Sequence, residues 1–422
     1  MSKSDDKITR RTLLAGAAIT GASLIPALRA ASQGVQGPAK PGTPSAASPV
    51  VPADPSAAPG APTSAQSVRS AFENPARTPV GLQTGSSLTP LHQLTGSITP
   101  NDLMFERHHS GVPTIDPAKH KLVVHGLVDR PMTFTVEDLK RFPSVSRIHF
   151  LECSGNGRAA YKAPTPEMTP QNVDGLTCNG EWTGVPLATV LNEVGVKPAA
   201  KWFLAEGSDA AKLSRSIPMD KAWDDALLVW AFNGEALRPS NGYPLRLFLP
   251  GYEGNTCIKW LRRIKLTDQP NMSKDETSKY TDPLKGGQAR MFSFLLDAKS
   301  VITSPATPAR IERGWREISG VAWSGRGKIQ RVDVSTDGGA TWKEAQLHGQ
   351  PLSKAHTRFT LMWEYTGGAT TLMSRATDDT GYTQPTRALF ESTRGKGTDY
   401  HFNYIRAWSV AQDGSVSFAG NA

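Results

Sequence analysis

The chain has 422 residues, of which 38% are hydrophobic and 20% charged, so it can bury the cores of about two domains. Its formal net charge is +9, but it has no run of five or more lysines and arginines and no nucleic-acid-binding motif, which argues against a nucleic-acid-binding protein. The positive charge is instead expected to serve anionic small molecules or an acidic partner.

Residues 1–31 have the layout of an export signal. Arg10 and Arg11 precede a mildly apolar run over residues 15–28, which is too short and too weakly apolar to span a membrane. The paired arginines favour a twin-arginine signal, which exports folded proteins, over an ordinary export signal. We therefore expect a periplasmic protein with no membrane span.

Residues 32–90 are rich in Pro, Ala, Gly and Ser and contain few aromatic or branched residues. Such a stretch buries too little apolar surface to offset the entropy lost on ordering, so it is predicted to be a disordered linker.

Residues 91–288 alternate between strand and helix patterns, which predicts an α+β domain. A helix is expected over residues 135–142 with Thr135 as its N-cap, and another over residues 186–194, ended by Gly195. The expected strands cover residues 121–128, 145–151, 226–232 and 244–249, and an Asn233-Gly234 turn follows the third.

Residues 289–400 consist of short β-like runs separated by turn residues, which predicts a β-sandwich. Asp337-Gly338-Gly339 is a hairpin signal. The aromatic tail, residues 401–422, is expected to pack onto the body of the protein or onto a partner. The runs cover residues 318–323, 329–335, 341–346, 359–363 and 371–377.

Three cysteines are present, Cys153, Cys178 and Cys257, and none lies in a C-x-x-C pair or a haem-attachment motif. Cys153 ends a predicted strand and begins a loop with two glycines and Arg158. Glycines let the backbone approach a bulky ligand, and a guanidinium favours the thiolate, which binds soft metals or attacks electrophiles. Residue chemistry alone leaves Cys153 as a metal ligand, a nucleophile or a buried structural thiol, and gives no role for the other two cysteines.

The segment LECSGNGR, residues 151–158, resembles the cysteine loop of the sulfite oxidase family, which holds an oxo-molybdenum pterin dithiolene cofactor through one thiolate. The resemblance covers roughly residues 91–400 and implies a molybdopterin-binding α+β domain, followed by an immunoglobulin-like sandwich through which the chain forms a homodimer. Further similar segments are NDLMFERHH at 101–109, WTGVPL at 182–187, NGYPLR at 241–246, Pro250-Gly251 and Lys259-Trp260-Leu261.

On the metal and substrate side, the resemblance implies that Cys153 binds molybdenum and that Arg107 holds an anionic substrate, with Arg158 adding positive charge near the metal. Arginine suits this role because it is permanently charged and binds oxyanions through a planar set of donors. Tyr280 falls near the position of the family's active-site tyrosine, but the local match is poor, and a surface-loop tyrosine is the alternative.

On the cofactor side, the resemblance implies that His109 contacts the pterin cofactor. Arg246 and Lys259 would lie along the phosphate end of the cofactor. The neighbouring His108 is interpreted as a supporting or exposed histidine.

Two departures from the family pattern refine this assignment. The chain has no haem motif, so electrons are expected to leave one at a time to a separate protein, a c-type cytochrome subunit. In addition, Gly254-Asn255-Thr256 stands where sulfite oxidases commonly have Gly-Ala-Arg. The missing arginine puts the cofactor- or sulfite-binding pattern in question.

Residues 92–113 and 152–154 most resemble the molybdenum subunit of sulfane dehydrogenases (SoxC type). This resemblance implies oxidation of sulfane sulfur, held as a persulfide on a cysteine of a sulfur-carrier protein, toward sulfone or sulfate. A periplasmic sulfite dehydrogenase that oxidises free sulfite is the closest alternative. A sulfoxide reductase of the same superfamily, which would need a membrane haem partner, is a third interpretation.

One motif suggests a different class of protein. Residues 335–342, STDGGATW, fit the Asp-box of sialidase-type propellers, but the motif occurs once, and a propeller would repeat it at blade spacing. A non-enzymatic exported sandwich protein would also contain such hairpins, but it would not explain the segments around Arg107 and Cys153.

Overall fold

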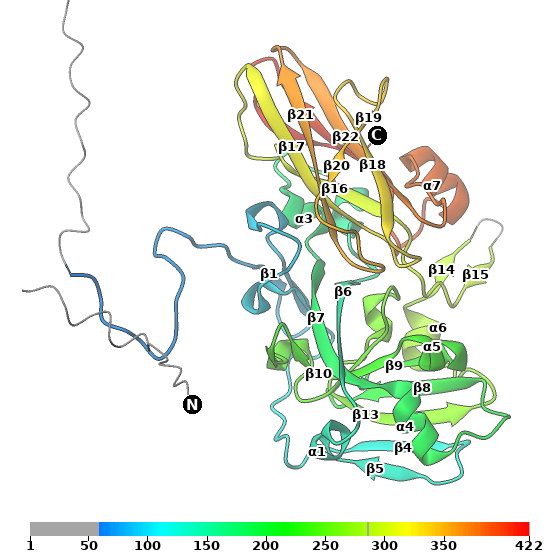
Figure 1. Cartoon of the computed structure of the whole chain (residues 1–422). Helices are drawn as coiled ribbons and strands as arrows, with labels where there is room; N and C mark the ends of the chain where they lie inside the picture. The colour runs from blue at the N-terminus through cyan, green and yellow to red at the C-terminus, as the bar shows by residue number, and fades with distance from the viewer. Residues whose placement is uncertain (1–58, 285–286, 422) are drawn as a thin grey trace, which may run out of the picture. The chain divides into compact units, whose positions relative to one another are not determined.

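The computed structural model describes residues 59–284 and 287–421 (Figure 1). The predicted export signal and residues 32–58 of the predicted linker lie outside the described residues. None of the helices in the described ranges is both long and apolar enough to cross a membrane.

Regular structure begins before residue 91, where the first domain was predicted to start. Strands β1 (Thr78–Gly81) and β2 (Gly85–Leu88) lie within the stretch predicted to be a linker, and β2 pairs with β3 (Glu106–His108). The stretch has few apolar side chains, but they include Leu88, which is buried against the protein body. This burial explains why part of the predicted linker forms strands.

Two five-stranded sheets form the N-terminal domain. The first has the order β11-β10-β7-β6, with β12 also paired to β10; its strands are β6 (Val145–Glu152), β7 (Thr177–Pro186), β10 (Leu227–Phe232), β11 (Glu235–Ala236) and β12 (Arg246–Phe248). The second has the order β5-β4-β13-β8-β9; its strands are β4 (Leu122–Gly126), β5 (Met132–Phe134), β8 (Trp202–Gly207), β9 (Ser214–Pro218) and β13 (Leu261–Thr267).

Short helices accompany these sheets. The α-helices are α1 (Val136–Lys140), α2 (Arg158–Lys162), α3 (Pro170–Asp174), α4 (Leu187–Val194), α5 (Met219–Asp224) and α6 (Lys274–Ser278). The 3-10 helices are Leu91–Gln93, Asn101–Leu103, Pro239–Asn241 and Gly254–Thr256.

The local signals in the sequence act as predicted. Thr135 caps α1 by accepting a hydrogen bond from the Asp138 backbone N–H at 3.1 Å, and the Asp138 carboxylate accepts one from the Thr135 N–H at 3.0 Å. Helix α4 ends at Gly195, whose φ is +70°. Asn233 and Gly234 both have positive φ in the turn between β10 and β11, as a tight hairpin turn requires.

The C-terminal domain is a sandwich of two sheets. One has the order β16-β17-β21-β20; its strands are β16 (Lys299–Ser304), β17 (Gly314–Trp323), β20 (Gln346–Leu347) and β21 (Thr357–Tyr365). The other has the order β19-β18-β22-β23-β24; its strands are β18 (Ile329–Ser335), β19 (Lys343–Glu344), β22 (Thr370–Asp378), β23 (Arg406–Val410) and β24 (Val416–Asn421). The pair β14 (Asp282–Pro283) and β15 (Ala289–Arg290) precedes this domain, and helix α7 (Arg387–Arg394) lies within it.

The predicted α+β domain followed by an all-β sandwich is confirmed, with two differences in detail. The run predicted over residues 341–346 is divided between the two sheets, because β19 pairs with β18 whereas β20 pairs with β21. The sandwich also continues past residue 400, because β23 and β24 of the aromatic tail complete its second sheet and bury Trp408. The single Asp-box motif is the hairpin between β18 and β19.

Candidate active site

A pocket with an empty volume of about 670 Å³, partly open to solvent, lies in the N-terminal domain. Its walls come from segments that are far apart in the sequence. Six of the seven residues predicted to form the site line it: Arg107, His109, Cys153, Arg246, Lys259 and Tyr280. The seventh, Arg158, does not line it.

Cys153 lies directly after β6, where its backbone N–H donates to the Leu176 carbonyl at 3.0 Å. Burial raises the pKa of its thiol, while the guanidinium groups of Arg107 and Arg158 and the Gly155 backbone act in the opposite direction. The thiol is half-buried at the pocket, whereas the other two cysteines are buried. Because burial disfavours the free thiolate, a bound metal ion would have to drive its deprotonation.

The cysteine loop (residues 153–157) depends on glycine for protein packing. Gly157 has a φ of +93°, and a Cβ there would lie 2.4 Å from Nη2 of Arg406. A Cβ on Gly254 would lie 2.7 Å from the Glu152 carbonyl oxygen. The glycine at 157 was expected to admit a bulky ligand, but in the structure it makes room for a buried arginine.

One wall of the pocket carries the two cations expected at the cofactor phosphate. Nζ of Lys259 donates to the carbonyls of Arg107 and Ser240, at 3.0 and 2.9 Å, and lies 2.8 Å from Nδ1 of His108. Nη1 of Arg246 donates to the Asn241 carbonyl at 2.9 Å, and its Nε is buried without a partner among the described residues. Burial lowers the pKa of Lys259 well below its ordinary value and also lowers that of Arg246.

His108 supports this wall rather than lying exposed, because its ring is buried between Lys259 and Glu106. Its Nε2 lies 2.9 Å from Oε2 of Glu106. This hydrogen bond, together with the guanidinium of Arg77, holds the pKa of the Glu106 carboxyl at about 2.

A second group of residues that line the pocket comprises Arg107, His109 and Tyr280. Nη1 of Arg107 donates to the carbonyls of Gly85, at 3.2 Å, and His108, which fixes the guanidinium to β2 and β3. The Tyr280 hydroxyl lies 2.8 Å from Nε2 of His109. Burial and the nearby Arg107 lower the pKa of His109 to about 4, so it is neutral at neutral pH, and burial raises the pKa of Tyr280. The structure therefore places Tyr280 in the pocket.

Arg158 contacts the C-terminal segment instead of the pocket. Its Nε and Nη2 donate to the Asp399 carbonyl at 3.0 and 2.7 Å, and its guanidinium carbon lies 5.0 Å from the centre of the Tyr400 ring. It still acts on the site, because its charge opposes the rise that burial causes in the pKa of Cys153.

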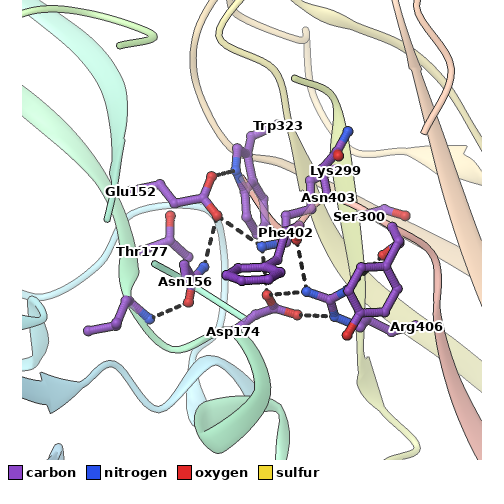
Figure 2. A network of polar contacts seen from close by, with 12 residues as sticks. Glu152, Asn156, Asp174, Thr177, Lys299, Ser300, Trp323, Phe402, Asn403 and Arg406 are labelled. Atoms are coloured by element: carbon purple, nitrogen blue, oxygen red, sulfur yellow. Dashed lines mark hydrogen bonds and ion pairs between the residues drawn. The ribbon is translucent and has the colours of Figure 1, made fainter. Parts of the chain in front are cut away.

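A buried ion network joins the residues around the cysteine loop to the sandwich (Figure 2). Nζ of Lys299 lies 2.9 Å from Oε1 of Glu152 and 2.6 Å from Oδ1 of Asp174. Arg406 donates to both carboxylate oxygens of Asp174, at 3.0 and 3.1 Å, and Nε1 of Trp323 donates to Glu152 at 2.7 Å. The sandwich thus fixes the residue that precedes Cys153.

Sequence reasoning missed this network and Arg215, a buried arginine behind the pocket. The only available signal was a charged residue at the first position of a strand, as for Lys299 in β16 and Arg406 in β23. That pattern does not indicate which carboxylate pairs with the charge.

Comparisons with known families agree with this geometry. The sequence profile described as the oxidoreductase molybdopterin binding domain matches residues 109–274. The profile described as the Mo-co oxidoreductase dimerisation domain matches residues 290–407. Together the two profiles cover more than half of the chain.

The pocket fits a molybdopterin cofactor, which is anionic and carries a phosphate. Within the described ranges, no carboxylate lies within 4.0 Å of a basic nitrogen of Arg107, Arg246 or Lys259, so no salt bridge within the protein occupies these pocket cations. The unpartnered Nε of Arg246 is a donor that a phosphate oxygen would satisfy. Cys153 offers the soft sulfur ligand that molybdenum would take.

Several relatives are enzymes of sulfur metabolism. The chain is 32% identical to mitochondrial sulfite oxidase from Mus musculus over 60% of its length, spanning half of that protein, and 30% identical to sulfite oxidase from Gallus gallus over 68% of each chain. The crystal structure of the sulfane dehydrogenase SoxCD from Paracoccus pantotrophus matches with a TM-score of 0.83 and 44% identity, covering 86% of this chain and 96% of that one. The chain therefore belongs to the sulfite oxidase family of molybdenum enzymes.

Proposed function

We propose that this protein is a molybdenum-dependent oxidoreductase that acts on a sulfur group, with Cys153 as the protein ligand of the metal. The observation that carries the proposal is the half-buried Cys153 thiol in a pocket whose cations have no ion pair within the described residues. A metal ligand surrounded by fixed positive charge suits an anionic cofactor and an anionic substrate.

The residues of the pocket divide the work between cofactor and substrate. Lys259 and Arg246 would bind the phosphate of the pterin, with His108 holding Lys259 in place. Arg107 would orient the substrate anion, and Tyr280, fixed by neutral His109, would donate a hydrogen bond to it. The bound cofactor would supply the two-electron oxidation of sulfur, and the protein the position and the electric field.

We propose sulfane sulfur as the substrate, held as a persulfide on a cysteine of a carrier protein, with electrons passing to a c-type cytochrome subunit. The similarity to the sulfane dehydrogenase SoxCD supports this substrate. The sequence Asn255-Thr256 also supports it, because the arginine common in sulfite oxidases is missing at residue 256. A separate acceptor agrees with the absence of a haem-attachment motif from the sequence.

Oxidation of free sulfite is the second candidate. It is favoured by the similarity to sulfite oxidases and by Arg107 and Tyr280, whose placement at the pocket suits a small oxyanion.

Anaerobic titration of the oxidised protein separates the two candidates without an electron acceptor. The visible thiolate-to-molybdenum absorption is followed while sulfite, and then a persulfidated carrier protein, is added. Bleaching by the persulfide alone supports sulfane oxidation, and bleaching by sulfite would make the protein a sulfite dehydrogenase. Absence of this absorption from cofactor-replete protein would contradict molybdenum ligation by Cys153.

Export and assembly complete the proposal. Paired Arg10 and Arg11 support folded export to the periplasm by the twin-arginine route, and the match to a dimerisation domain supports a homodimer. Replacing both arginines by lysine should retain the protein in the cytoplasm, as cell fractionation would show, and light scattering should give the mass of two chains.

A further inference from the structure

Arg215 is a buried cation that lies behind the active-site pocket. It belongs to β9, and its side chain has no solvent-exposed surface. Within the described ranges, its Nε and Nη2 have no hydrogen-bond partner, and the nearest carboxylate oxygen is Oε1 of Glu276, 3.8 Å from Nε. A guanidinium with two unsatisfied donors is costly to bury, so a structural role alone explains it badly.

The guanidinium of Arg215 reaches the pocket through two residues that line it. Its carbon lies 4.8 Å from the centre of the Tyr280 ring, and its Nη1 donates to Oδ1 of Asn255. Asn255 in turn donates to Oγ of Ser154 at 3.0 Å, next to Cys153. Arg215 is thus connected both to the tyrosine that faces the substrate and to the cysteine loop.

The segment that contains Asn255 lacks an arginine that is common in sulfite oxidases. Thr256 stands where sulfite oxidases commonly have arginine, and it is buried with its hydroxyl donating to the Glu253 carbonyl at 2.7 Å. Asn255, which stands in place of their alanine, is the residue that accepts the hydrogen bond from Arg215. A guanidinium from β9 therefore contacts the residue next to Thr256.

We propose that Arg215 is a positioning residue that acts through Asn255 and Tyr280 to set the affinity of the pocket for oxyanions of sulfur. This inference rests on the proposed function. Because the charge lies behind the pocket wall, it attracts an anion without occupying the space in front of Cys153. A substrate bulkier than free sulfite then finds room in the pocket.

The test is calorimetric titration of sulfate into the oxidised holoenzyme, whose visible thiolate-to-molybdenum absorption confirms cofactor loading. Arg215→Met should raise the Kd for sulfate by about tenfold or more, the scale of one interaction with a charged group. Arg215→Lys keeps the charge and should stay within about threefold of the wild type. Arg310→Met, which removes an arginine that is 70% exposed on the sandwich, is the charge-matched control and should leave the Kd unchanged.

Rescue distinguishes a positioning role from a purely structural one. Adding Asn255→Ala and Thr256→Arg to Arg215→Met restores the Gly-Ala-Arg pattern and should recover sulfate binding, which a loss of packing at β9 would not. If Arg215→Met yields no loaded protein, Asn255→Ala alone carries the test, and it too should weaken binding.

The proposal is overturned if the wild type binds no sulfate. It is also overturned if cofactor-loaded Arg215→Met keeps the wild-type Kd, or, where Arg215→Met cannot be loaded, if Asn255→Ala keeps it. Either result with the visible absorption intact leaves the molybdenum assignment standing. Loss of the absorption from the wild type would remove the proposed function instead.

Discussion

Buried and half-buried cations form two groups near the cysteine loop, and the groups differ in what neutralises them. The pocket cations have no ion pair among the described residues. In the buried ion network, Lys299 and Arg406 are paired with Glu152 and Asp174 at 2.6–3.1 Å. Burial of a charge costs several kcal/mol unless a partner offsets it. Paired cations therefore indicate a structural role, and unpaired cations indicate a place for an anionic ligand.

The largest expected effect comes from removing one lysine from each group. Lys299→Met leaves Glu152 and Asp174 buried with only Arg406 to neutralise them, so it should lower the free energy of unfolding by about 3–5 kcal/mol. Lys259→Met removes a cation that has no ion pair, so the cofactor-free protein should keep its stability within about 1 kcal/mol or gain some. Urea unfolding of the cofactor-free proteins measures both. Equal losses would contradict the distinction between the two groups.

The next effect concerns the substrate side of the pocket. Tyr280→Phe removes the hydroxyl bound to His109 and available to the substrate, so kcat/KM for the sulfur substrate should fall about 10–100-fold, the value of a hydrogen bond to a charged group. The visible absorption should not change, because Tyr280 does not ligate the metal. Tyr400→Phe is the control, since Tyr400 contacts Tyr280 but does not line the pocket, and its kcat/KM should stay near the wild-type value. A large loss of cofactor from Tyr280→Phe would place this residue in the cofactor site instead.

The smallest expected effect is on how the free energy of unfolding depends on pH. It comes from His356, which packs against Trp323 of the buried ion network. His356 is stacked against Phe150 and Trp323, and burial lowers its pKa to about 3. Between pH 6.5 and pH 3 the unfolded chain binds the proton more tightly than the folded protein, so stability falls as the pH falls through this window. His356→Gln removes this term. The wild type should therefore lose about 1 kcal/mol more than the variant between pH 6.5 and 5.5, as measured by urea unfolding. Parallel pH profiles would show that folding does not lower the pKa of His356.

The comparison also explains what the sequence could predict. The predicted strands, the capped helices and the Asn233-Gly234 turn follow from local patterns and lie close to the observed elements, whereas β7, β8, β9 and β13 were not predicted. The pocket cations Arg246 and Lys259 lie in motifs with a family resemblance, so their meeting in one pocket could be anticipated. Arg215 and Lys299 lie in strands without such motifs, and their roles depend on partners that are distant in the sequence.

The extent of the domains was harder to predict than their type. Strands β2 and β24 lie in stretches that were expected to be linker and tail. Composition underestimates such strands, because a few buried side chains, including Leu88 and Phe418, are enough to hold them in a sheet.

The central claim is that Cys153 binds molybdenum while the pocket cations hold the cofactor. It is tested most directly by measuring pterin content and visible absorption in the wild type, in Cys153→Ser, and in Cys178→Ala as a buried-cysteine control. We predict that Cys153→Ser loses the thiolate-to-molybdenum absorption but keeps the pterin, whereas Cys178→Ala keeps both. Undiminished absorption in Cys153→Ser would contradict the account.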